Sequence, residues 1–112
     1  MRLTANEKAV LKAMAFNHYG EGTNTWSWAI NESRAPSGLK GKTLSGVVAS
    51  LVKKGLFSVS GEGKESAIYT TEAGFAEMAK AGWMKKDEKW GHVPNWDEIE
   101  DSGRVAMEKD NG

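Results

Sequence analysis

The chain has 112 residues and no cysteine, and its 15 basic side chains balance 15 acidic ones. This length predicts a single domain whose core needs no disulfide or metal, and the missing cysteines exclude disulfides, thiolate zinc sites and cysteine nucleophiles. No apolar run approaches the roughly 18 residues of a membrane span, and the charged N-terminus lacks an apolar signal core, so we expect a cytoplasmic protein that does not contact membranes.

A first helix is predicted over residues 5–18. Thr4 and Glu7 form a capping box, in which the Thr4 hydroxyl accepts from the backbone N–H of residue 7 and the Glu7 carboxylate accepts from the Thr4 N–H. The apolar face of this helix holds Val10, Leu11 and Met14. Gly20 ends the segment, because glycine adopts the left-handed conformation of a helix C-terminus at the lowest cost.

The next segment predicts a loop and a short helix. The loop spans residues 20–25, and a second helix begins at Trp26 and fades near Arg34. Trp26 and Trp28 are two residues apart and cannot share a helical face, so we expect one in the core and the other exposed or under the C-terminal segment. Residues 35–38, which include a proline and a glycine, predict a second loop.

A third helix is predicted from about Lys42 to Lys54, and Gly55 caps its C-terminus. Its apolar stripe consists of Leu44, Val47, Val48, Leu51 and Val52. After Gly55 the apolar period changes from about 3.6 residues to 2, which indicates a half-buried strand. A polar, glycine-rich turn and a returning strand follow, and together they predict a β-hairpin across residues 56–70.

A fourth helix is predicted from about residue 71, capped by a threonine. Beyond it the chain becomes acidic, since residues 87–112 hold eight Asp and Glu against three Lys and Arg. Several apolar residues interrupt this acidic run, among them Trp90, Val93, Trp96 and Ile99. Residues 95–98 predict the cap of one short helix. We therefore divide the chain into a domain over residues 1–82 and an acidic, tryptophan-containing extension over residues 83–112.

The order of three helices, a hairpin and a further helix resembles the winged-helix family, specifically the MarR/PadR-like branch of bacterial transcription regulators. The resemblance lies in Leu51–Phe57, where the third helix ends in a glycine cap and enters a strand, and in Tyr69–Gly74, where the second strand leads into the next helix. It covers roughly residues 3–80. It implies an α+β fold, a winged helix-turn-helix with a three-helix core, a two-stranded β-hairpin wing and a C-terminal helix, and it implies a DNA-binding transcriptional regulator.

In that fold the third helix lies in the DNA major groove. The exposed face of residues 42–54 offers lysines and hydroxyls for phosphate, but it lacks the Arg, Asn and Gln side chains that make bidentate base contacts. The wing would be residues 61–66, whose only cation is Lys64. We therefore predict double-stranded DNA binding with modest base specificity. The candidate DNA-binding residues are Arg34, Lys40, Lys42, Thr43, Ser45, Gly46, Ser50, Lys53 and Lys64.

Gly46 stands in the middle of the predicted third helix, where glycine costs about 1 kcal/mol relative to alanine. One interpretation is the close approach of a DNA strand or a partner surface. The other is contact with a neighbouring helix or plain tolerance of the glycine.

The charge distribution bears on the choice between two functions. Residues 1–60 carry eight basic and three acidic side chains, and this basic half contains the third helix, which favours DNA. The rival hypothesis is a winged helix that acts as a protein-interaction module, such as a small inhibitor or adaptor, without binding DNA. The wing without arginine, the zero net charge and the acidic extension favour this rival.

The acidic extension leaves two interpretations open. It folds back over its own domain, or it mediates homodimerisation or binding to a protein partner, because aromatic anchors dominate interfaces. We expect it to pack away from the third helix, since a masked helix would need a release signal.

His18 and His92 are the only histidines. They lie far apart in the chain, and the carboxylates around them are scattered, so they make no recognisable catalytic or metal-binding set. We therefore expect no enzyme activity, no catalytic residue, no bound metal and no cofactor.

Overall fold

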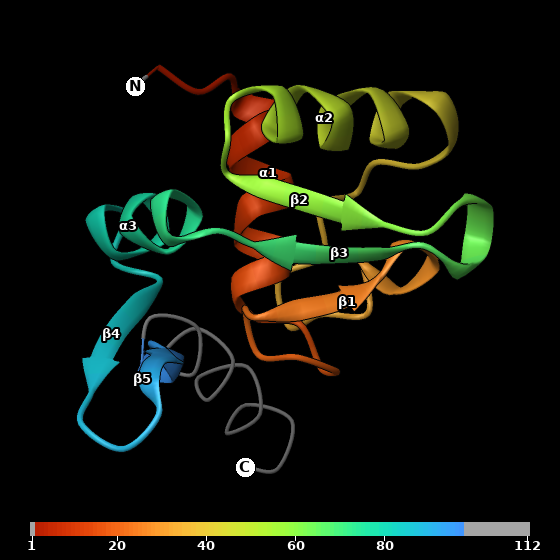
Figure 1. The fold of residues 1–112 in the computed structure, drawn as a ribbon. Helices are drawn as coiled ribbons and strands as arrows, with labels where there is room; N and C mark the ends of the chain where they lie inside the picture. Colours follow the sequence, from red (N-terminus) through yellow and green to blue (C-terminus); the bar gives the residue numbers. More distant parts are fainter. Residues whose placement is uncertain (1, 98–112) are drawn as a thin grey trace, which may run out of the picture.

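Three α-helices and two small antiparallel sheets make up the part of the chain that the computed structural model describes, residues 2–97 (Figure 1). The predicted α+β class is therefore confirmed. The elements in chain order are α1 (Ala5–Ala15), β1 (Asn24–Trp26), the 3-10 turn η1 (Ser27–Ala29), α2 (Gly41–Lys53), β2 (Phe57–Ser60), the 3-10 turn η2 (Gly63–Glu65), β3 (Ala67–Thr70), α3 (Glu72–Lys80), β4 (Met84–Asp87) and β5 (Gly91–Pro94).

The elements with strong local signals lie where the sequence predicts them. The capping box is present at the start of α1, and α2 begins one residue before the predicted position. Gly55 follows α2 with φ +79, the left-handed conformation expected after a helix end. The strands β2 and β3 pair as the predicted hairpin, with Phe57 opposite Thr70. The Thr71 side chain caps α3 by accepting from the backbone N–H of Gly74 at 3.0 Å.

The first helix is shorter than predicted, because α1 ends at Ala15 and not at residue 18. The cause is Asn17, which is fully buried. Its amide donates to the carbonyl of Ala29 at 2.8 Å, and its Oδ1 accepts from the backbone N–H of Tyr19 at 2.9 Å. An asparagine that bonds the backbone in this way competes with the helical hydrogen bonds. His18 consequently lies beyond the helix and is exposed.

The segment between α1 and α2 also departs from the prediction. A loop over residues 20–25 and a helix from Trp26 were expected, but residues 24–26 form the strand β1 and only the single turn η1 is helical. The strand pairs antiparallel with β3, which gives the sheet order β1-β3-β2. Trp26 is 46% exposed and Trp28 is 55% exposed. The prediction that one of the two tryptophans lies in the core was therefore wrong.

The hydrophobic core is centred on α1, which the other elements surround (Figure 1). Its largest fully buried side chains come from all three helices, the hairpin and the loops: Phe16, Phe57, Leu11, Met14, Ile30, Leu51, Leu56, Ile68, Met78 and Val10. Leu51 is the one residue of α2 that is buried. The helix α2 therefore lies on the surface of the domain, with most of its side chains accessible.

The C-terminal extension contains a hairpin that the sequence analysis did not predict. β4 pairs with β5, and Trp83 and Trp96 both pack against the core. The Trp96 ring lies 5.5 Å from the ring of Phe16 at the C-terminal end of α1, whereas Trp90 is 72% exposed. Figure 1 shows α2 across the opposite, N-terminal end of α1. Residues 83–97 thus lie away from α2, and the rest of the predicted extension, residues 98–112, falls outside the described residues.

The short helix predicted at residues 95–98 is described only at its start. Trp96 and Asp97 have helical conformation, and residue 98 falls outside the described residues. Within residues 2–97, no helix has the length and the apolar composition needed to cross a membrane.

Candidate nucleic-acid interface

The N-terminal half of α2 presents a basic surface. Lys40 is the N-cap residue and makes no capping side-chain hydrogen bond, and the first turn contains no acidic residue. Lys42 and Thr43 follow and are exposed. The first backbone N–H groups of a helix have no intrahelical partner and carry partial positive charge. Together with the two lysines, they make this end of α2 suited to an anion such as a phosphate group.

Most of the predicted DNA-binding residues lie on α2 or at its start. The exposed ones among them are Lys40, Lys42, Thr43, Ser45, Gly46 and Lys53. The hydroxyl of Ser45 donates to the carbonyl of Gly41 at 2.9 Å. Ser50 differs from this group, because it is only partly exposed and its hydroxyl donates to Oε2 of Glu7 at 2.6 Å. Its side chain therefore joins α2 to α1 and faces away from the exposed surface.

Arg34 lies apart from the residues of α2. Its backbone N–H donates to the carbonyl of Phe16 at 3.1 Å, at the C-terminal end of α1. There it lines a hollow of about 250 Å³ together with His18, Glu21 and Trp96. Because α2 contacts the other end of α1, Arg34 and the α2 lysines do not form one surface.

Lys64 belongs to η2, the turn between β2 and β3. This places its backbone at the tip of the hairpin, where the sequence analysis expected the wing.

The position of α2 on α1 is fixed by Glu7, which is 2% exposed. Its Oε1 accepts from Nζ of Lys54 at 2.7 Å and from the backbone N–H of Thr4 at 2.8 Å, and Ser50 donates to its Oε2. The hydrogen bond from Lys54, followed by those from Ser50 and Thr4, lowers the pKa of Glu7 from 4.5 to about 2 against the opposing effect of burial. Glu7 thus holds the C-terminal half of α2 and leaves its N-terminal half free.

The sequence analysis assigned Glu7 only to the capping box. Its second role depends on Lys54, which lies on another helix, and no local pattern connects the two. The signal that the sequence offered was the pair of lysines at the end of the third helix, which also suits the helix dipole without any partner.

Gly46 has no neighbour that would require a glycine. A Cβ built at this position meets no described atom within 4 Å, so the interpretation as contact with a neighbouring helix was wrong. Tolerance of the glycine and close approach of a partner are the two interpretations left. The position borders a shallow hollow of about 420 Å³ between α2 and the start of α1.

The replacement Gly46→Ala is expected to raise the free energy of unfolding by about 0.5–1 kcal/mol, because alanine has the higher helix propensity and the space is open. Urea unfolding followed by circular dichroism measures this gain. If the variant is stabilised and still binds DNA as well as the wild type, the glycine is merely tolerated. A stabilised variant with weakened DNA binding identifies a close approach of the ligand.

An apolar groove of about 1050 Å³ runs between α2 and the hairpin of β2 and β3. Its apolar lining consists of Trp28, Leu44, Val48, Ala49, Val52, Val59 and Ile68. Val52 is 36% exposed and Val59 is 44% exposed, and exposed apolar patches of this kind mark interaction sites. The sequence analysis identified the apolar stripe of the third helix, but no local pattern showed that part of this stripe lines an exposed groove with the distant hairpin.

The described residues offer no sign of a metal centre. Within residues 2–97, no three His, Cys, Asp or Glu side chains are grouped so that they could hold a metal ion. The ring of His92 stacks on Phe75 with 4.7 Å between the ring centroids, which gives this histidine a packing role.

No protein-family model, no curated protein and no solved structure matches this chain.

Proposed function

We propose that this chain is a winged-helix protein that binds double-stranded DNA through α2 and acts as a transcriptional regulator. The order α1, β1, η1, α2, β2, β3 is compatible with this fold: η1 takes the place of its second helix, α2 is the recognition helix and β2, η2 and β3 form the wing. The element α3 then follows the wing.

The observation that carries the proposal is the exposed, basic N-terminal half of α2. The helix contains no acidic residue, its N-terminus has no side-chain cap, and the N-cap Lys40 and Lys42 in the first turn are exposed. Lys53, at the C-terminal end of α2, is exposed as well. Lysines, hydroxyls and free N–H groups contact phosphate oxygens. Since no Arg, Asn or Gln accompanies them, affinity depends mainly on the DNA backbone and base specificity is modest.

The replacements Lys42→Ala and Lys64→Ala test this proposal. Each is expected to weaken binding to all duplex sequences alike and to reduce the salt slope of log K by about one unit, because one phosphate contact is lost. Fluorescence anisotropy with a labelled short duplex, measured over a series of salt concentrations, gives both quantities.

The matched control is Lys86→Ala, which removes the same charge from β4, on the hairpin away from α2. It is expected to leave the salt slope unchanged. Equal effects of all three variants would show that only the overall charge matters and would contradict binding through α2.

The apolar groove beside α2 favours a second candidate function, a protein-interaction module. A partner that buries Trp28, Val52 and Val59 would remove their exposed apolar surface from water. Under this candidate the full chain does not bind duplex DNA at low salt. The replacement Val59→Ser then abolishes partner binding, whereas under the DNA proposal it leaves DNA affinity within a few-fold.

A further inference from the structure

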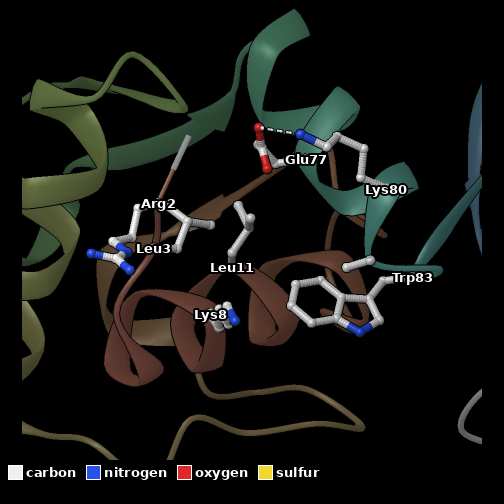
Figure 2. A pocket seen from close by; sticks show the side chains of 8 residues that line it. Arg2, Leu3, Lys8, Leu11, Glu77, Lys80 and Trp83 are labelled. Atoms are coloured by element: carbon white, nitrogen blue, oxygen red, sulfur yellow. Dashed lines mark ion pairs between the residues drawn. The ribbon is translucent and has the colours of Figure 1, made fainter.

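A pocket of about 640 Å³ opens between the N-terminal segment, α1 and the end of α3, away from the apolar groove (Figure 2). Its lining residues are Arg2, Leu3, Lys8, Leu11, Glu77, Lys80, Ala81 and Trp83. This volume lies within the range of pockets that bind small molecules in proteins. Neither the predicted DNA-binding surface nor the core explains the combination of side chains that line it.

The interior of the pocket is apolar. Leu11 is fully buried and lies at the base, and Figure 2 shows Leu3 on one side of it and the indole ring of Trp83 on the other. Both side chains are partly exposed and pack against the core. An alkyl chain or an aromatic ring placed over Leu11 would lose its contact with water, which favours binding.

The rim of the pocket is cationic. The lining contains three cations, Arg2, Lys8 and Lys80, and a single acid, Glu77, whose carboxylate lies 3.6 Å from Nζ of Lys80. Within residues 2–97, neither Arg2 nor Lys8 makes an ion pair. A further ammonium group, that of Lys12, lies 5.8 Å from the centroid of the Trp83 ring. The excess of positive charge at the mouth attracts anions and disfavours cations.

Hydrogen bonds position the backbone on two sides of the pocket. Nζ of Lys54 donates to the carbonyl of Arg2 at 3.0 Å and so ties the N-terminal segment to α2. The backbone of Trp83 is held by two hydrogen bonds. Its backbone N–H donates to the carbonyl of Met78 at 2.9 Å, and its carbonyl accepts from the backbone N–H of Asn95 at 2.8 Å. The backbone on these two sides therefore needs no rearrangement to admit a ligand, which limits the entropy lost on binding.

We propose that this pocket binds an amphipathic organic anion, a carboxylate or a similar headgroup attached to an apolar chain or ring. The apolar part lies over Leu11 between Leu3 and Trp83. The headgroup accepts hydrogen bonds from Lys8 and Lys80 at the rim, since hydrogen bonds between charged groups are the strong ones. The site does not depend on the proposed DNA binding by α2.

Three probes with the same alkyl chain separate charge from apolar contact: octanoate, 1-octanol and octylammonium. The readout is the indole N–H signal of Trp83 in two-dimensional NMR of the full chain, one of five tryptophan signals, with Trp83→Phe used for assignment. Octanoate is expected to shift this signal with saturation and a Kd of about 1 mM or below. Octanol is expected to bind about tenfold more weakly, and octylammonium to give no saturable shift.

Variants of the rim test the role of the lysines. The double replacement Lys8→Gln and Lys80→Gln is expected to weaken octanoate binding by about tenfold, whereas Glu77→Gln is expected to tighten it, because the single acid of the rim is removed. The matched control is Lys86→Gln with Lys89→Gln, which removes the same charge from residues outside the pocket. It should leave the Kd within about twofold at equal ionic strength.

Three results would overturn the proposal. The first is an equal response of Trp83 to octanoate and octylammonium. The second is an octanoate shift at Trp28, in the groove beside α2, without one at Trp83. The third is the absence of a saturable shift up to about 10 mM octanoate. The replaced lysines of the rim and the control are exposed, and thermal melting checks that every variant is folded.

Discussion

Replacement of Glu7 by glutamine is expected to lower the free energy of unfolding at pH 7 by about 2 kcal/mol. The carboxylate accepts hydrogen bonds from Lys54, Ser50 and Thr4, which hold its pKa at about 2. The shift from 4.5 corresponds to a stabilisation of about 3 kcal/mol, and the 33% exposure of the Lys54 side chain reduces this through solvent screening. The melting temperature should fall by roughly 10 °C, as measured by circular dichroism.

The effect of Glu7 is expected to depend on pH with a defined sign. Because the pKa is lower in the folded state than in the unfolded state, the stabilisation is fully present above pH 4.5 and is lost as the pH falls toward 2. The difference in unfolding free energy between the wild type and Glu7→Gln should therefore shrink over this interval. The control Asp97→Asn removes an exposed ion pair with Lys85 and should change stability by less than about 0.5 kcal/mol. A constant difference from pH 7 to 3 would show that packing, and not the ionised carboxylate, is responsible.

Replacement of Gly74 by alanine is expected to destabilise the protein by about 2 kcal/mol. A Cβ at this position would clash with the backbone carbonyl oxygen of Leu56, so α3 must move away from the segment that links α2 to β2. The gain in helix propensity of about 1 kcal/mol offsets only part of this cost. Urea unfolding measures the change.

Gly46→Ala is the matched control for this prediction, because it is the same replacement in a helix at a position with open space. The two variants should change the free energy of unfolding in opposite directions. A Gly74→Ala variant as stable as the wild type would mean that α3 does not approach Leu56 so closely.

The parts of the fold that were predictable carry local signals. The capping box at Thr4 and Glu7, the 3–4 residue spacing along α2 and the glycine after it are each contained within a few residues. The strand β1 has no such signal, because three residues become a strand only by pairing with the distant β3. The early end of α1 likewise depends on Asn17, whose amide donates to the carbonyl of Ala29 in another segment.

The candidate site was predictable to the extent that it lies on one helix. Lys42 and Lys53 of α2 are exposed, as expected from the 3–4 residue spacing, which places them off the apolar stripe of the helix. Ser50 could not be assigned from its position alone, because a contact with Glu7 decides where it points. The pocket around Leu11 combines three separate segments, residues 2–3, 8–11 and 77–83. Only the tertiary structure brings such segments together.

The salt dependence of binding of the full chain to short duplex DNA tests the central proposal most directly. If α2 contacts phosphates through its lysines, binding is saturable at low salt, and log K falls linearly with log salt with a slope of about −2 to −3. Unrelated duplex sequences should give similar slopes, because the contacts are to the backbone. No binding at low salt, or a slope near zero, would contradict the account and favour the protein-interaction module.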